Sequence, residues 1–293
     1  MLNHQKPVRL APTPRKRKAL KMLWIPLFLY LAAFVLLASL QRTFMYHPER
    51  GDEKKFLAMA PQHQVLPWRD EHNQLIGWKR VLDTRVGDKP APYRMLILHG
   101  NGGHALTRTY FMDGFGALGQ GRDWEFYSLE YPGYGWRKGS TTQTEIVAAA
   151  DEALEELLKN DARPLYITGE SLGTGVACLL AARHPKQVRG LFLATPYTST
   201  TDVAQGRFPI FPVRWVMQDR YEAARALNGY SGPVAILLAG RDFIVPTHFG
   251  QSLFDGYSGP RKRWIQPDAG HNTLDYNPRA AWWKDVADFL LQH

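Results

Sequence analysis

Strand-like apolar runs alternate with helical patterns from residue 75 to residue 291, and this alternation leaves the chain few possible folds. Parallel strands need long crossover connections, usually helices, which then cover both faces of the sheet. The sequence therefore predicts an α/β fold with a mainly parallel sheet and helices on both faces. The expected strands cover residues 75–82, 94–98, 124–131, 164–168, 188–194, 234–239 and 262–265, and the expected helices cover residues 146–158, 172–183, 247–254 and 280–291.

Composition excludes several classes of protein. The 293 residues suit one catalytic domain plus an appendage. The single cysteine, Cys178, rules out an intramolecular disulfide and a cysteine-based zinc site, and its apolar helical surroundings predict a buried small side chain. The formal net charge is +9, but residues 1–22 hold seven Lys or Arg and no acidic residue. The rest is near neutral, which gives no support for a nucleic-acid partner.

Residues 23–40 read LWIPLFLYLAAFVLLASL, an uncharged run about long enough to cross a bilayer as a helix. The basic flank precedes this run, and the positive-inside rule then keeps residues 1–22 in the cytoplasm. We expect a single-pass membrane anchor at 23–40, a connecting segment at 41–70 and an extracytoplasmic catalytic domain at 71–293.

Two alternatives to the anchor stay open. A cleaved signal peptide has the same polarity, but Ala38–Gln41 fits a cleavage site poorly, and the apolar run is longer than usual for such a peptide. A buried core helix is the other alternative, and the unbroken apolarity of this run on every face argues against it.

The strongest chemical motif is Gly169–Gly173, which reads GESLG between an expected strand and an expected helix. That context is the one in which a nucleophilic serine stands on a sharp strand-to-helix turn. The glycines allow close approach of neighbouring backbone, and the following helix N-terminus favours developing negative charge. We interpret Ser171 as a catalytic nucleophile; the alternative is a capping serine in a glycine-rich turn.

A serine hydroxyl needs a base to accept its proton, and the base needs an acid to orient it. In folds that carry a serine on such a turn, the acid follows the serine in the chain and the histidine comes last. Asp242 and His271 fit this order. Asp242 directly follows the expected strand 234–239, and His271 lies in a loop after the last strand. Asp268 and Asp275 are closer to His271 in sequence, but neither ends a strand.

An oxyanion hole needs two backbone N–H groups aimed at the substrate carbonyl. Leu172, the residue after the nucleophile, is expected to supply one of them. The second is expected from the loop 99–103, which reads HGNGG after an early strand, with Asn101 as the favoured donor. Taken alone, this loop would be interpreted as a flexible glycine turn.

Together these segments resemble the α/β-hydrolase superfamily and, more narrowly, the membrane-anchored Bem46-like group of serine hydrolases. The resemblance covers roughly residues 45–290 and is carried by Tyr46–Pro48, His99–Asn101, Tyr131–Gly135, Gly169–Gly173, Gly240–Asp242 and Gly270–His271. It implies an α/β-hydrolase fold, a triad of Ser171, Asp242 and His271, and oxyanion donors at Asn101 and Leu172. The group includes esterases, thioesterases, lipases and peptidase-like hydrolases.

The stretch 198–221 departs from that pattern, because it is a short cap rich in apolar side chains. A lid of this kind would suit an acyl chain; simple packing onto the domain is the other interpretation. These apolar residues are Phe208, Ile210, Phe211, Trp215, Val216 and Met217.

The function expected from these observations is hydrolysis of a carboxylic ester, including acyl esters and thioesters, through an acyl-enzyme on Ser171. Such a reaction needs neither metal nor cofactor. The expected substrate is a small-molecule or lipid-like ester, and residues 23–40 are expected to contact the membrane. Two alternatives stay open: an amide or peptide hydrolase with the same triad, and a membrane-tethered binding protein on a hydrolase scaffold.

Overall fold

The structure is a computed structural model that describes residues 14–81, 91–119, 123–159 and 161–293. The chain divides into two compact units, Met1–Gln41 and Arg42–His293. Helix α1 runs over Pro14–Met45, and its segment Trp24–Met45 is long and apolar enough to cross a membrane. A helix of that length spans about 33 Å, against a hydrocarbon core of about 30 Å. The helix extends beyond both ends of the expected anchor.

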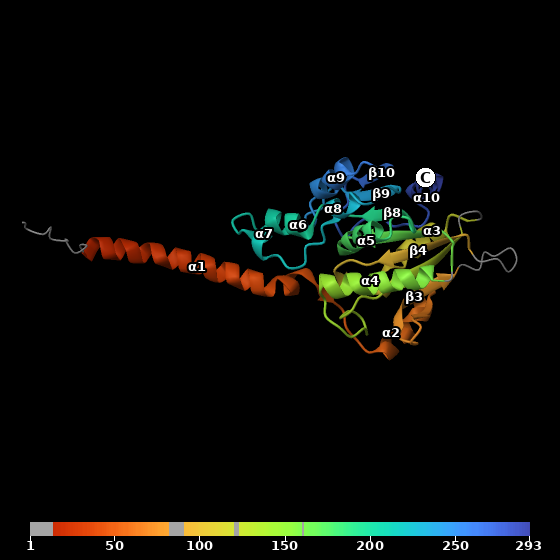
Figure 1. Cartoon of the computed structure of the whole chain (residues 1–293), viewed down its shortest axis with the longest axis horizontal. Helices are drawn as coiled ribbons and strands as arrows, with labels where there is room; N and C mark the ends of the chain where they lie inside the picture. The colour runs from red at the N-terminus through yellow and green to blue at the C-terminus, as the bar shows by residue number, and fades with distance from the viewer. Residues whose placement is uncertain (1–13, 82–90, 120–122, 160) are drawn as a thin grey trace, which may run out of the picture. The chain divides into compact units, whose positions relative to one another are not determined.

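In the unit Arg42–His293, eight strands of the described chain form one sheet in the order β10-β9-β8-β7-β4-β6-β3-β2 (Figure 1). Neighbouring strands are parallel from β10 to β6, and β3 and β2 continue the sheet by antiparallel pairing. The α/β fold with a mainly parallel sheet is thus confirmed. The strands are β2 Leu66–Arg69, β3 Leu75–Val81, β4 Tyr93–Leu98, β6 Trp124–Leu129, β7 Leu165–Glu170, β8 Val188–Ala194, β9 Val234–Ala239 and β10 Arg261–Gln266. Leu82, expected as the last residue of the strand that corresponds to β3, lies outside the described residues.

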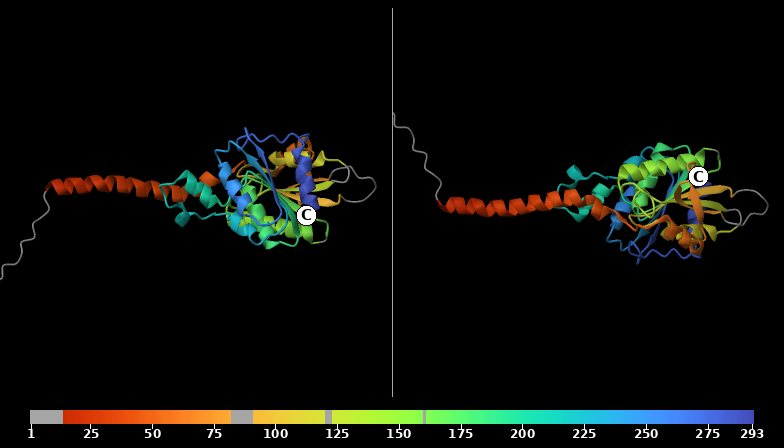
Figure 2. Two further views of the ribbon diagram at one scale, coloured as in Figure 1. Left: turned by 90° about the horizontal axis from the view of Figure 1, so that it is seen from above. Right: turned by 90° about the horizontal axis from the view of Figure 1, so that it is seen from below.

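Helices cover the sheet on both faces and lie on opposite sides of it in Figure 2. The central strands read as continuous apolar runs because alternate side chains enter different cores. In β4, Met95 and Ile97 belong to one buried cluster, and Leu96 and Leu98 belong to the other. The first cluster includes helices α3 Tyr110–Gly116 and α10 Trp282–Gln292; the second includes α4 Gln143–Leu158, α5 Leu172–Arg183, α8 Ala223–Leu227 and α9 Thr247–Gly256.

The segment 41–70, expected as a connection, contributes structure to the domain. It holds β1 (His47–Pro48), α2 (Glu53–Met59), the 3-10 helix η1 (Ala60–His63) and the edge strand β2. Its prolines are compatible with these elements: Pro61 lies in the first turn of η1, and Pro67 lies in an edge strand, where a missing N–H is tolerated.

The stretch 198–221, expected as a short cap, contains two short helices between β8 and α8. They are α6 (Thr200–Arg207) and α7 (Val213–Val216). Cys178, on α5, is fully buried as expected, and burial raises the pKa of its thiol.

Candidate active site

Ser171 occupies the turn between β7 and α5 with φ 49° and ψ −116°, a conformation that non-glycine residues rarely adopt. Its N–H donates to the carbonyl of Ala194 at 2.9 Å, which ties the turn to β8. A Cβ on Gly173 would lie 2.1 Å from the Leu98 carbonyl oxygen, and a Cβ on Gly169 would lie 2.5 Å from that of Gly173. The two glycines are therefore needed for the chain to pass this closely.

The structure brings three of the predicted residues into one line of contacts. Ser171 Oγ lies 2.9 Å from His271 Nε2, and His271 Nδ1 lies 2.6 Å from Asp242 Oδ2. The other carboxylate oxygen of Asp242 accepts from the backbone N–H groups of Ile244 at 2.9 Å and Val245 at 2.8 Å. The side chains of Asp242 and His271 are 2% and 8% exposed, so this contact is largely shielded from water.

Backbone contacts between two loops bring the acid and the base together. The turn after β9 carries Asp242, and the loop after β10 carries His271. Gly240 N–H donates to Gln266 O at 2.9 Å, and Arg241 N–H donates to Ala269 O at 2.8 Å. These bonds continue the parallel pairing of β9 and β10 beyond the sheet, so the register of two strands sets the distance between the side chains.

The rival acids lie elsewhere. Asp268 pairs with Arg241 at 2.6 Å on the surface, and its side chain is 82% exposed. Asp275 accepts from the backbone N–H of Asn277 at 2.9 Å. The carboxylate that the structure places against the His271 ring belongs to Asp242.

The loop after β4 runs beside the serine. A Cβ on Gly100 would lie 3.5 Å from Ser171 Cβ. Asn101 Nδ2 donates to Met45 O at 2.9 Å, and Asn101 O accepts from Tyr134 Oη at 2.8 Å. Because its side chain and carbonyl are engaged in this way, Asn101 would meet a substrate through its backbone N–H. Leu172 is the first residue of α5, where helix N–H groups point away from the helix.

Sequence reasoning missed an ion pair that joins this loop to the serine turn. Arg108 Nε donates to Glu170 Oε2 at 2.6 Å, and its second terminal nitrogen donates to Gly102 O at 3.0 Å. Tyr110 Oη donates to Glu170 Oε1 at 2.5 Å, and burial together with the Glu170 carboxylate raises the pKa of Tyr110. Glu170 and Arg108 are 62 residues apart, so no local pattern signals their contact.

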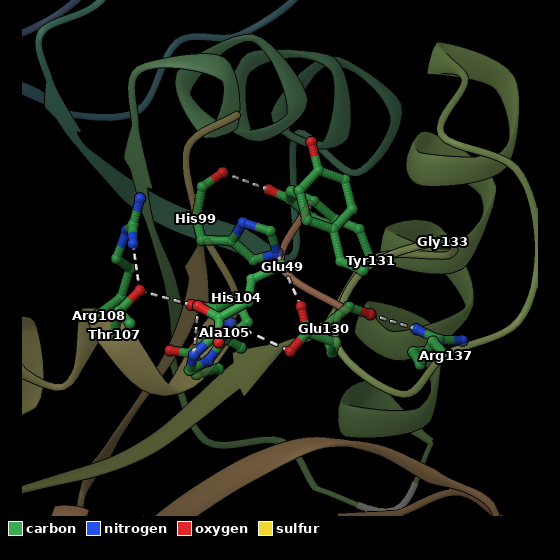
Figure 3. Close-up of polar contacts among 12 residues, drawn as sticks. Glu49, His99, His104, Ala105, Thr107, Arg108, Glu130, Tyr131, Gly133 and Arg137 are labelled. Carbon is green, nitrogen blue, oxygen red and sulfur yellow. Dashed lines mark hydrogen bonds and ion pairs between the residues drawn. The ribbon is translucent and has the colours of Figure 1, made fainter. Parts of the chain in front are cut away.

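A second polar cluster is buried beneath the same loop (Figure 3). Glu130 and His99 are fully buried and face one another at 3.2 Å. Glu130 also accepts from the backbone N–H of Ala105 at 3.1 Å, and Tyr131 Oη donates to His99 O at 3.0 Å. The bonds to Ala105 N–H and from Tyr131 Oη hold both ends of the loop, which stiffens it. Within the described residues, no three His, Cys, Asp or Glu side chains are grouped to hold a metal ion.

The sheet, the serine turn and the acid and histidine loops define a protein of the α/β-hydrolase fold. Residues 93–229 match the family described as alpha/beta hydrolase fold. The predicted α/β-hydrolase fold is confirmed, and the predicted resemblance is supported by this match and by the similarity to protein bem46.

Three comparisons illustrate the relationship. An uncharacterized protein of Mycobacterium tuberculosis is 28% identical over 237 residues, which is 80% of this chain and 81% of the relative. Protein bem46 of Schizosaccharomyces pombe is 25% identical over 179 residues, 57% of this chain and 58% of the relative. The ferulic acid complex of Est1E from Butyrivibrio proteoclasticus superposes with a TM-score of 0.59 at 17% identity, covering 74% of this chain and 95% of Est1E. At 17% identity the superposition supports a shared fold and nothing further.

Proposed function

We propose that this chain is a membrane-anchored serine hydrolase that cleaves carboxylic esters, including acyl esters and thioesters, through an acyl-enzyme. The observation that carries the proposal is the contact series Ser171 Oγ, His271 Nε2, His271 Nδ1 and Asp242 Oδ2, at 2.9 and 2.6 Å. These are the distances and order that a nucleophile, a base and an orienting acid require.

In the proposed mechanism, Ser171 Oγ attacks the ester carbonyl carbon while His271 Nε2 accepts the serine proton. The tetrahedral oxyanion accepts hydrogen bonds from the backbone N–H groups of Leu172 and Asn101. The alcohol leaves with the proton from His271, and the acyl group stays on Ser171. His271 then takes a proton from water, the resulting hydroxide attacks the acyl carbon, and Ser171 regains its proton as the acid is released. No metal or cofactor takes part.

Fluorophosphonate labelling of the purified full chain tests this mechanism. The reagent phosphonylates an activated serine. The wild-type chain should therefore become labelled, and so should the control variant Ser258→Ala, which removes an exposed serine. The Ser171→Ala variant should stay unlabelled. Hydrolysis of p-nitrophenyl acetate should fall by several orders of magnitude in Ser171→Ala. Labelling that survives in Ser171→Ala would refute the nucleophile. Preferred turnover of peptides over esters would favour the amide-hydrolase alternative, and a chain that neither labels nor turns over would favour a binding protein.

We further propose that α1 crosses the membrane once, with residues 1–22 in the cytoplasm and the hydrolase unit outside it. Support comes from the apolar segment Trp24–Met45 and from the basic residues that precede it. A reporter fused after His293 should be accessible only from outside the cytoplasm. Protease digestion of that reporter from the cytoplasmic side would contradict the topology. Loss of the first 40 residues from the mature chain would favour a cleaved signal peptide.

A further inference from the structure

The chain enters the hydrolase unit beside the active-site loop. Met45 is the last residue of α1, and its carbonyl accepts from Asn101 Nδ2 at 2.9 Å. Two residues later, His47 N–H donates to Asn101 O at 2.9 Å, and β1 pairs with β5 (Gly102–Gly103). Since Asn101 belongs to the loop that passes Ser171, one residue, Tyr46, separates the apolar helix from a strand bonded to the active site.

The same short segment also holds the stretch 198–221. Arg42 Nε donates to Asp219 Oδ2 at 2.8 Å, and the Asp219 side chain is 4% exposed. Tyr46 and Tyr221 share a hydrogen bond between their hydroxyls at 3.2 Å. The end of this stretch is therefore fixed to residues that either belong to the candidate span or directly follow it.

Large apolar side chains are exposed beyond the carboxyl ends of the neighbouring strands β8 and β9. Trp215, on α7, is 84% exposed. Phe243 and Ile244, which directly follow Asp242, are 81% and 55% exposed. Exposed arginines accompany Trp215 in the stretch 198–221, namely Arg207, Arg214 and Arg220. Tryptophan beside apolar and cationic side chains is the composition of surfaces that lie in the headgroup region of a bilayer.

We propose that Trp215, Phe243 and Ile244 contact the surface of the bilayer that holds α1, with the arginines of the stretch 198–221 near lipid phosphates. The bilayer is the expected partner because the candidate span ends at Met45, whose carbonyl accepts from Asn101 in the loop beside Ser171. The inference rests on the proposed anchor and deepens the proposed function. The active site then takes esters that are held in the bilayer, since the end of the sheet that carries Ser171 and Asp242 meets the lipid surface.

Site-specific labelling tests the contact directly. Cys178 is fully buried, so a cysteine introduced at the surface can be labelled selectively with the environment-sensitive fluorophore NBD. Full-length Trp215→Cys and Phe243→Cys are reconstituted into phosphatidylcholine vesicles, with and without anionic lipid. Lipids that carry a nitroxide near the headgroup should quench both labels severalfold more than a label at Leu66→Cys. Leu66 is 58% exposed, and it lies in the edge strand β2.

Hydrolysis rates on two substrates distinguish an effect on lipid contact from an effect on the catalytic site. Trp215→Ser should slow hydrolysis of a long-chain ester held in vesicles by roughly tenfold, as expected when one large apolar side chain is withdrawn from an apolar phase. Hydrolysis of soluble p-nitrophenyl acetate should stay within about twofold of wild type, because exposed substitutions rarely disturb the fold. Equal loss on both substrates would overturn the proposal and place Trp215 in the acyl site.

Quenching at Trp215→Cys and Phe243→Cys no greater than at Leu66→Cys would also overturn the proposal. The quenching is repeated in the Ser171→Ala background, so failure of the triad leaves this measurement unaffected. Vesicle flotation after carbonate extraction tests the anchor separately. A chain released by carbonate would overturn both the anchor and the lipid contact, without any consequence for fluorophosphonate labelling.

Discussion

Replacing Asp242 by asparagine should reverse the tautomer of His271. The Oδ1 atom of Asp242 accepts from two backbone N–H groups, those of Ile244 and Val245. In Asp242→Asn the single amide oxygen is needed at that position, which turns the amide NH₂ toward His271 Nδ1. His271 must then accept at Nδ1 and carry its proton on Nε2, the atom that lies 2.9 Å from Ser171 Oγ. A protonated Nε2 cannot take the proton of the serine.

The expected loss in kcat is at least about 1,000-fold, the scale known for a reversed tautomer in serine proteases. At 1.36 kcal/mol for each tenfold change, this corresponds to about 4 kcal/mol of transition-state stabilisation. The assay is p-nitrophenyl acetate hydrolysis by the purified full chain, with circular dichroism to confirm folding.

Asp268→Asn and Asp275→Asn are the matched controls. Asp268 forms an exposed surface pair with Arg241, so its loss should change kcat by no more than about twofold. An Asp242→Asn variant with kcat within tenfold of wild type would refute the assignment of the acid. A large loss in Asp268→Asn alone would transfer the role to that residue.

Three further substitutions test how the site is supported. Gly114→Ala should lower the free energy of unfolding by about 2 kcal/mol, because the new Cβ would lie 2.1 Å from the buried Trp283 ring; thermal unfolding measures it. Arg108→Met should lower both kcat and the melting temperature, since it leaves the largely buried Glu170 without its cation, and an unchanged kcat would contradict a positioning role. Gly173→Ala should lose fluorophosphonate labelling, because its Cβ would collide with the backbone carbonyl at the end of β4; normal labelling would show that the turn adapts.

Much of the fold could be predicted because its signals are local. The strands β8 and β9 and the helix α5 begin and end where their apolar runs do. Serine, acid and histidine follow in chain order at strand ends, so Ser171, Asp242 and His271 could be proposed from the sequence. Their meeting in space follows from the parallel pairing of β7, β8, β9 and β10.

Other parts lack local signals. Helix α3, with glycines at 114 and 116, has low helix propensity and is stabilised by packing against α10. The contacts of Asn101 with Met45 and of Glu170 with Arg108 join residues more than 50 positions apart. The prolines of the segment 41–70 favour irregular chain, whereas an edge strand and a short 3-10 helix accommodate Pro67 and Pro61.

The positive φ of Ser171 lowers the stability of the folded chain at the position where the proposed chemistry needs a serine. Glycine adopts such a conformation freely, whereas a residue with a Cβ is held there at a cost of about 1 kcal/mol or more. A chain selected for thermal stability alone would therefore exchange this serine for glycine and lose the proposed nucleophile. A deep mutational scan that records abundance and turnover together would mark position 171 as the place where the two traits diverge. Such a scan would find the reactive centre with no assumption about mechanism.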